Sequence, residues 1–260
     1  MQNKTIEIPL SSQKTVTLKV DSWIQAALYR LNPPEPEVTA FMAKYAKGDI
    51  LDIGAHVGVH SVALAHLVGP KGRVFAFEPT PTTFKLLKKN CRSLKNVFLF
   101  NKAVTQSGKR EIHMTDYGIF SAWNTTDSQG RFSSVIDFLL RRLYTKKFTA
   151  IAISIDKVLQ DQPDIKPKLI KIDVENAELG VLKGGEITIK KFKPAIIFEG
   201  GQDKHRSPDT NTKTIIDILK SWGYSFFVYD TEKSKVVPHK VLDFYPIFIN
   251  ILALHASHKK

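Results

Sequence analysis

The sequence of 260 residues contains very little cysteine and no long apolar run. The single cysteine, Cys91, excludes an internal disulfide and a cysteine-rich metal site. No apolar stretch reaches the roughly 18 residues that a membrane-spanning helix needs. Residues 1–10 lack the basic start and apolar run of a secretory signal, and the chain has no internal repeat or low-complexity tract. We therefore expect a soluble, cytoplasmic protein without a transmembrane segment.

Acidic side chains are also scarce, since 38 Lys and Arg residues outnumber 25 Asp and Glu residues and give a formal net charge of +13. Residues 79–110 contain no acidic side chain. The basic residues of this stretch are Lys85, Lys88, Lys89, Arg92, Lys95, Lys102, Lys109 and Arg110. Such a surface attracts nucleic acid, anionic lipid or phosphorylated substrates, although a solvated basic face without a partner explains the same pattern.

Apolar segments with strand and helix character alternate from residue 50 onward. The expected strands are residues 50–53, 73–77, 97–100, 169–173, 195–199, 225–228 and 247–254, and the expected helices are 58–67, 82–91, 177–183 with an extension to 191, and 211–222. The last two strands follow each other without a helix, which predicts an antiparallel hairpin at one edge. The pattern predicts a Rossmann-like α/β fold with a seven-stranded, mostly parallel sheet and an N-terminal extension.

Two segments lie outside this alternation. Residues 1–47 are expected to form a hairpin and two helices (residues 23–31 and 38–46) packed on the domain of residues 48–260. That domain carries an insertion at about residues 115–149, which lies between expected strands at 111–114 and 150–155. Within the insertion, residues 132–144 have apolar side chains at helical spacing, followed by Lys146 and Lys147. We interpret this helix as a lid or dimer face. The alternative is contact with a membrane surface or a lipid-linked substrate.

A turn with two glycines follows the first strand of the alternation. In residues 51–58, Gly54 permits a tight turn and a close approach of backbone to ligand, and the next helix offers free N–H groups at its start. The spacing is not the G-x-G-x-x-G pattern of dinucleotide-binding proteins. It is closer to the D-x-G-x-x-x-G turn of class I methyltransferases, in which the carboxylate, here Asp52, faces the methionine portion of the cofactor.

The ends of the next two strands carry polar residues suited to an adenosine. Glu78 ends the second strand, where a carboxylate accepts both ribose hydroxyls, and no other acid lies near it in the sequence. Asn101 follows the third strand and is the polar group best placed to contact the edge of the base.

Several motifs recur in a fixed order, and together they carry a family resemblance. They are residues 52–61 (DIGAHVGVHS), 75–81 (FAFEPTP), 101–104 (NKAV) followed by Gly108, 154–156 (SID), 169–178 (LIKIDVENAE), 181–185 (VLKGG) and 194–199 (PAIIFE). In this order and spacing the chain resembles the FkbM family of methyltransferases over about residues 35–199.

The resemblance implies an S-adenosylmethionine-dependent O-methyltransferase that acts on hydroxyls of sugars, glycans or natural-product-like acceptors. The positions that match the cofactor site, or lie in its first motif, are Asp52, Gly54, His56, Gly58, Ser61, Glu78, Asn101 and Asp173. Two residues depart from the family pattern. His56 stands where Asn is usual but can still donate a hydrogen bond to the cofactor, and Asn176 stands where Gly is usual but tolerates a left-handed backbone.

Acidic residues follow the ends of two later strands. Ligands of open α/β sheets bind outside the carboxyl ends of the strands, so Asp173 and Glu199 are expected to face one crevice. Lys171, Asp173 and Glu175 lie on one side if their strand continues. Asp173 is our first candidate for the base or positioning group of a methyl transfer, followed by Glu199 and Glu175.

Other roles remain open for the acidic residues of this region. Asp173 and Glu199 could hold Mg²⁺, which lowers the pKa of a hydroxyl. Glu175 and Glu178 could instead pair with a lysine or cap the next helix. His205 is a further candidate base, although a lone loop histidine is more often only exposed.

Two other functions remain open for the whole chain. The basic charge alone favours an RNA methyltransferase, for which no RNA-binding module is present. The departures at His56 and Asn176 leave room for a non-catalytic binding protein that keeps the fold. The acceptor, the methylated position and the oligomeric state do not follow from the sequence.

Overall fold

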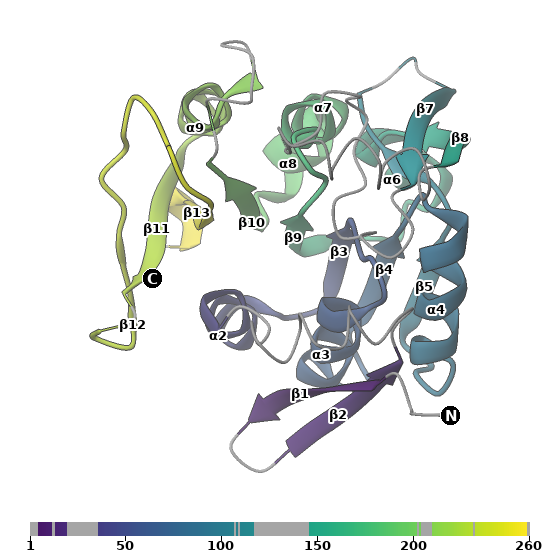
Figure 1. Ribbon diagram of the computed structural model, residues 1–260. Coiled ribbons are helices and arrows are strands. Elements are labelled where there is room, and N and C mark those ends of the chain that lie inside the picture. Colours follow the sequence, from purple (N-terminus) through teal and green to yellow (C-terminus); the bar gives the residue numbers. More distant parts are fainter. Residues whose placement is uncertain are drawn as a thin grey trace, which may run out of the picture.

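A computed structural model describes residues 5–11, 14–19, 36–106, 108, 110–116, 146–201, 203, 210–230 and 232–258. The expected helices at residues 23–31 and 132–144, and His205, lie outside these ranges. In the described residues a central eight-stranded sheet crosses the molecule (Figure 1). Its strands in spatial order are β12 (Lys235–Pro238), β11 (Tyr224–Asp230), β13 (Ile249–His255), β10 (Ala195–Gly200), β9 (Pro167–Ile172), β3 (Asp49–Ile53), β4 (Arg73–Phe77) and β5 (Val97–Phe100).

The strand directions confirm the expected sheet. The five strands from β10 to β5 are parallel, whereas β13 runs antiparallel to both β10 and β11. The seven expected strands are all present, and β12 extends the sheet by pairing with β11 at the edge.

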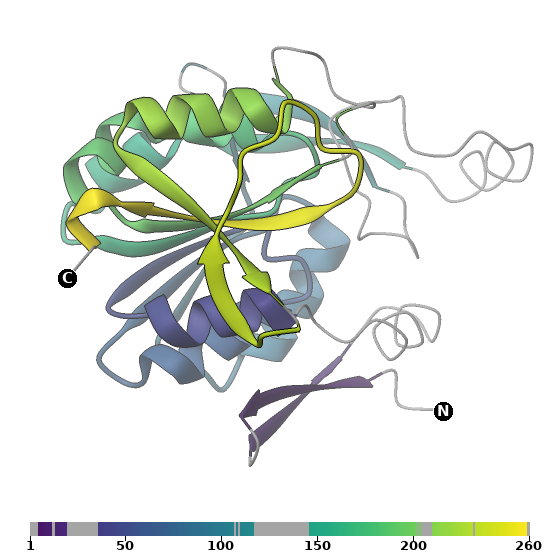
Figure 2. The same cartoon turned by 90° about the vertical axis from the view of Figure 1, so that its left-hand side faces the viewer.

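Helices cover both faces of the sheet, as Figure 2 shows from the side. One face carries α2 (Pro36–Tyr45), α3 (Val59–Val68) and α4 (Pro81–Cys91), and the other carries α6 (Ile155–Asp161), α7 (Glu178–Gly184), α8 (Glu186–Phe192) and α9 (Thr212–Ser221). Successive residues of β3 alternate between them: Ile50 packs in the apolar cluster of α2 and α3, and Leu51 in the cluster of α6 to α9. Because both faces are covered, the parallel strands read as nearly continuous apolar runs.

The helix expected at residues 177–191 is two helices, α7 and α8, joined at Gly185. The glycines of this junction allow close packing. A Cβ atom added to Gly184 would lie 2.1 Å from the Thr105 carbonyl oxygen, so a larger residue would push α7 away from the chain after β5.

A second sheet of three strands lies beside the carboxyl ends of β4 and β5. It consists of β6 (Ala103–Val104), β8 (Lys146–Ile153) and β7 (Glu111–Asp116), in the order β6-β8-β7. The segment expected as a strand at residues 150–155 is in fact divided between β8 and α6. The division occurs at Ser154, whose hydroxyl accepts a hydrogen bond from Lys157 N at 3.2 Å and so caps α6.

The N-terminal hairpin of β1 (Thr5–Ser11) and β2 (Lys14–Lys19) packs on α3 and α4 (Figure 1). Ile6 and Leu18 are buried in one apolar cluster with side chains of both helices. The side chain of Asn90 hydrogen-bonds Lys19 N and O and also donates to Val57 O at 2.8 Å. The hairpin therefore braces the segment that precedes α3.

Three of the eight basic residues of the stretch 79–110 lie on the outer face of α4. Lys85, Lys88 and Lys89 are exposed, whereas Leu87 and Cys91 are buried against α3 and the hairpin. The lysines are thus the polar side of an amphipathic helix. Within the described ranges, no helix is both long and apolar enough to cross a membrane.

The close contact between β3 and β9 depends on Gly54. This residue has φ +83°, and a Cβ atom added to it would lie 1.7 Å from the Asp173 carbonyl oxygen. The turn after β3 can therefore lie directly against the end of β9 only because residue 54 has no side chain.

We predict that Gly54→Ala destabilises the protein much more than Gly69→Ala. Gly69 also has a positive φ, +66°, but no atom lies within 4 Å of its added Cβ. Both variants carry the cost of left-handed backbone, and only Gly54→Ala adds a backbone clash, which we expect to cost at least about 2 kcal/mol more. Urea denaturation followed by circular dichroism measures the difference. Equal losses for the two variants would contradict the close contact.

Candidate active site at the carboxyl ends of the parallel strands

The turn after β3 is held against the end of β4 by backbone hydrogen bonds. Gly54 N and Ala55 N both donate to the Phe77 carbonyl oxygen, at 3.0 and 2.9 Å. His56 has a left-handed backbone, with φ 50°, and Gly58, with φ 95°, is the N-cap of α3. These contacts bring the glycine turn beside the acidic residue that follows β4.

The Glu78 carboxylate closes this turn. Its Oε2 accepts a hydrogen bond from His56 N at 3.0 Å, and its Oε1 accepts one from Thr80 N at 2.8 Å. Burial raises the pKa of Glu78 to about 7, against the opposing effect of these hydrogen bonds, and the carboxylate of Asp116 raises it further. Glu78 is therefore not the only acid of its neighbourhood, as the sequence suggested, because β7 brings Asp116 close to it.

Asp52 is enclosed beneath the turn rather than exposed to the crevice. Its side chain is fully buried, and its Oδ2 accepts a hydrogen bond from Ser61 Oγ at 2.5 Å. Its Oδ1 lies 3.8 Å from the Nζ atom of Lys171, its register partner on β9. Burial raises the pKa of Asp52, and Lys171 opposes that shift. Asp52 and Ser61 therefore contact the turn and Lys171 from inside, and a contact of either residue with the cofactor stays a prediction.

Lys171 links this buried acid to the crevice. Its side chain is only 4% exposed, and its Nζ donates to Asp173 Oδ2 at 3.0 Å, whereas the Asp173 side chain is 37% exposed. Burial alone would raise the pKa of Asp173, but the Lys171 ammonium outweighs it and holds that pKa below its usual range. Asp173 is therefore a fixed negative charge at the crevice.

Two histidines of the glycine turn and α3 are neutral at physiological pH. Burial lowers the pKa of His56 to about 4 and that of His60 to about 3. The neighbouring Lys171 ammonium lowers both further, against the opposing effect of Asp173. Their side chains add no positive charge to the turn.

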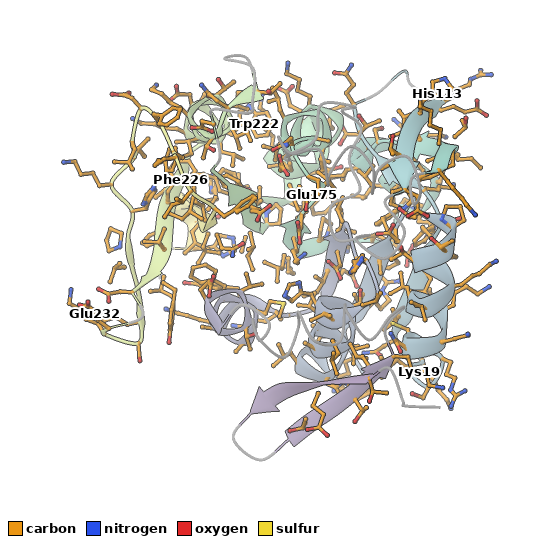
Figure 3. All side chains as sticks on the ribbon, viewed as in Figure 1. Lys19, His113, Glu175, Trp222, Phe226 and Glu232 are labelled. Carbon is orange, nitrogen blue, oxygen red and sulfur yellow. The ribbon has the colours of Figure 1, made fainter. Side chains whose placement is uncertain are left out.

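Asp173, Glu175 and Glu199 gather in one acidic cluster at the ends of β9 and β10. One carboxylate oxygen of each lies within 4.8 Å of the others. Figure 3 shows Glu175 near the middle of the molecule, beside these strands. A group of this size could hold a cation, and the ammonium of Lys171 already lies beside Asp173. Binding of Mg²⁺ by Asp173 and Glu199 stays a prediction.

The backbone after β9 brings Glu175 into the cluster. The strand ends at Ile172, so the strand alternation that was expected to place Glu175 on the same side as Lys171 and Asp173 does not extend to Glu175. Instead Glu175 and Asn176 are left-handed, with φ 50° and 75°. Asn176 therefore has the left-handed backbone that it was expected from the sequence to tolerate.

Two further residues named from the sequence hold the loops of the site. Glu178 is buried in the first turn of α7, and its Oε1 accepts a hydrogen bond from Asn176 N at 3.2 Å, which agrees with the capping interpretation. Asn101 Nδ2 donates to Glu78 O at 2.8 Å and Pro79 O at 2.9 Å. Asn101 thus shapes the loop after β4, and its contact with a base stays a prediction.

An apolar hollow lies beside Glu78 and the glycine turn. It is lined by Gly54, Phe77 and Pro79 of the main sheet and its loops, by Val104 of β6, and by Ile112 and Met114 of β7. Sequence reasoning missed these two residues and Asp116. The available signal for Ile112 and Met114 was their alternation in the expected strand at residues 111–114, whereas Asp116 lies beyond that expected strand.

Comparison with known families assigns most of this region to one domain. The model of the methyltransferase FkbM domain matches residues 52–226, which begin at Asp52 and include the glycine turn, Glu78 and the acidic cluster.

Two kinds of relatives were found beyond the family model. A Haloferax volcanii protein described as hexuronic acid methyltransferase AglP is 29% identical over 152 residues, and the match spans 58% of this chain and 56% of the relative. A crystal structure of a methyltransferase FkbM from Methylobacillus flagellatus is 18% identical, with a TM-score of 0.47, over 81% of this chain and 44% of that one. Fibrillarin from Aeropyrum pernix with bound S-adenosylmethionine is 14% identical, with a TM-score of 0.43, over 81% of this chain and 68% of that one.

We predict that Lys171→Met lowers the free energy of unfolding by about 3–5 kcal/mol, because it leaves the buried carboxyl group of Asp52 without its neighbouring cation. Lys168→Met is the matched control, since Lys168 lies on the same strand but is exposed. The double variant Asp52→Asn/Lys171→Met removes the enclosed charge and recovers part of the loss. Denaturation of all three in urea measures these differences. A Lys171→Met protein as stable as the control would contradict the role of the buried ammonium.

Proposed function

Because the chain belongs to the FkbM family of S-adenosylmethionine-dependent methyltransferases, we propose that it methylates a hydroxyl group of a sugar, with a hexuronic acid as the preferred acceptor. The observation that carries the proposal is the acidic cluster of Asp173, Glu175 and Glu199 at the edge of the glycine turn. The sugar class is taken from the curated relative, which acts on a hexuronic acid by its description.

The residues at the glycine turn fit S-adenosylmethionine. The apolar hollow suits a flat base, and Glu78 beside it is an acceptor for the ribose hydroxyls. Gly54 and Gly58 let the turn pack closely against the Asp173 backbone and the Leu87 side chain, while His56 and Asn101 shape its two sides. Asp173, which Lys171 keeps ionised, supplies a fixed negative charge for the cationic methionine end. When bound, the cofactor supplies an electrophilic methyl group on a sulfonium centre.

The acidic cluster provides the remaining chemistry. The acceptor oxygen forms a bond to the methyl carbon, the carbon–sulfur bond breaks toward sulfur, and a carboxylate takes the proton of the hydroxyl. Asp173 has a lowered pKa and forms an ion pair with Lys171, so it is a weak base. We assign it a positioning role instead. We therefore assign proton transfer to Glu199 or Glu175.

The charges also indicate which group of a hexuronic acid is methylated. The net charge of +13 attracts an anionic sugar to the protein. Within the crevice, however, three carboxylates repel the carboxylate of that sugar. A hydroxyl group is the better partner for the cluster, so the product is a methyl ether rather than a methyl ester.

We predict methyl ether formation on oligosaccharides that end in hexuronic acid. The protein is incubated with S-adenosylmethionine and such glycans, and the product is analysed by mass spectrometry before and after mild alkali. A methyl ether survives the alkali, whereas an ester is hydrolysed. Matched glycans that end in the neutral hexose serve as the control. Alkali-labile product, or equal use of both glycan sets, would contradict the proposed acceptor chemistry.

We predict that substitutions of the three carboxylates have different effects in steady-state kinetics. We expect the variant of the base, Glu199→Gln or Glu175→Gln, to lose about 10²-fold or more in kcat while KM for the cofactor is kept. Asp173→Asn is expected to raise KM for the cofactor instead. An Asp173→Asn enzyme with wild-type kinetics would contradict its assignment to the cofactor.

Cofactor affinity should rise with pH up to about 8. Glu78 has a pKa of about 7 in the free protein, and it accepts two ribose hydroxyls only as a carboxylate, so binding releases its proton. Affinity therefore rises by up to about tenfold per pH unit below the pKa and is constant above it. Isothermal titration with S-adenosylhomocysteine between pH 6 and 9 measures the curve. Glu78→Gln should flatten it, and an unchanged slope in this variant would assign the titration to another group.

A further inference from the structure

The two sides of β7 differ in character. Glu111 and His113 are exposed, and His113 Nδ1 lies 3.2 Å from Thr149 Oγ1 on the outer side (Figure 3). On the other side Met114 is 9% exposed and Asp116 is 7% exposed. Because residues of a strand alternate in direction, Ile112, Met114 and Asp116 share the inner side. We call these three residues the inner side of β7.

The inner side of β7 completes the apolar hollow beside Glu78. Ile112 and Met114 line it opposite residues that follow the central strands, among them Gly54 and Pro79. The thioether of Met114 is flexible and polarizable and packs well against flat aromatic rings. The side chains that β7 gives to the hollow are apolar, and the Glu78 carboxylate beside it is polar, which is the division that a nucleoside requires.

Asp116 fastens this wall to the main sheet. Its Oδ2 accepts a hydrogen bond from Thr82 Oγ1 at 2.8 Å, in the first turn of α4. Thr82 follows the loop of residues 78–80, whose ends are tied together by Glu78. The contact therefore fixes the distance between the wall and the carboxylate that accepts the ribose.

We propose that the inner side of β7 is the wall against which the adenine ring of the cofactor stacks, with Met114 as the contact residue and Asp116 as a positioning residue. This inference rests on the proposed function and adds to it the part of the cofactor that β7 recognises. Residues 111–116 lie within the matched domain but in none of the motifs that carried the resemblance, so this wall is assigned from the structure.

The test uses two ligands that differ only in the amino-acid half. S-adenosylhomocysteine carries both halves, and 5′-methylthioadenosine keeps the adenosine and the sulfur. We expect Met114→Ala to weaken both ligands by the same factor, about tenfold, because the lost contact is to adenine. His113→Ala, on the outer side of the same strand, should leave both dissociation constants unchanged, and Met114→Leu should recover most of the loss.

Asp116 is tested by rescue. Asp116→Ala should weaken both ligands, whereas Asp116→Asn keeps an oxygen that accepts from Thr82 and should restore binding to within about threefold. At pH 9, where Glu78 is ionised in every variant, Thr82→Val should match Asp116→Ala, and the double variant should lose no more than either alone.

The outcomes separate this wall from the proposed function. If Met114→Ala binds 5′-methylthioadenosine like the wild type, or loses affinity only for S-adenosylhomocysteine, the assignment of β7 to adenine is wrong while the methyltransferase assignment stands. If the wild type binds neither ligand, the proposed function and the wall both fail.

Discussion

A nearly buried ammonium group lies between two carboxylates at the end of the central strands, and the geometry of the site follows from it. Lys171 Nζ is 3.0 Å from Asp173 and 3.8 Å from Asp52, two residues that belong to neighbouring strands. Gly54 lets these strand ends touch, since a side chain there would meet the Asp173 backbone. The arrangement keeps one acid inside and presents the other, ionised, at the crevice. The glycine turn, the Glu78 and Asp173 carboxylates that we assign to the cofactor, and the acidic cluster all lie around this contact.

Much of the fold could be predicted from the sequence because parallel strands buried on both faces read as short apolar runs. The strands 73–77 and 97–100 have the predicted bounds, and the glycine turn precedes α3 as expected. Elements with weak periodicity were missed. β12 is a short edge strand, β6 has two residues, and α6 begins directly after a strand at a serine cap. Such elements form through tertiary pairing and capping rather than through a pattern of their own.

The positions of the site residues were predictable where they depend on strand order, and were not predictable where they depend on side-chain burial. Asp173 and Glu199 meet because parallel strands end at one edge, and this followed from the alternation alone. That Asp52 is enclosed, and that Lys171 lies beside Asp173, depends on packing that spacing does not encode. Asp116 lies close enough to Glu78 to raise its pKa although the two residues are far apart in the sequence, so no local pattern could reveal their proximity.

The most direct test of this account is a crystal structure of the protein with S-adenosylhomocysteine. The account predicts that the ribose hydroxyls contact Glu78, that the amino-acid end lies beside Gly54 and Asp173, and that Lys171 stays in contact with Asp173. The sulfur should then point toward Glu175 and Glu199. A ligand bound away from the glycine turn, or an Asp173 side chain turned away from Lys171 in the complex, would contradict it.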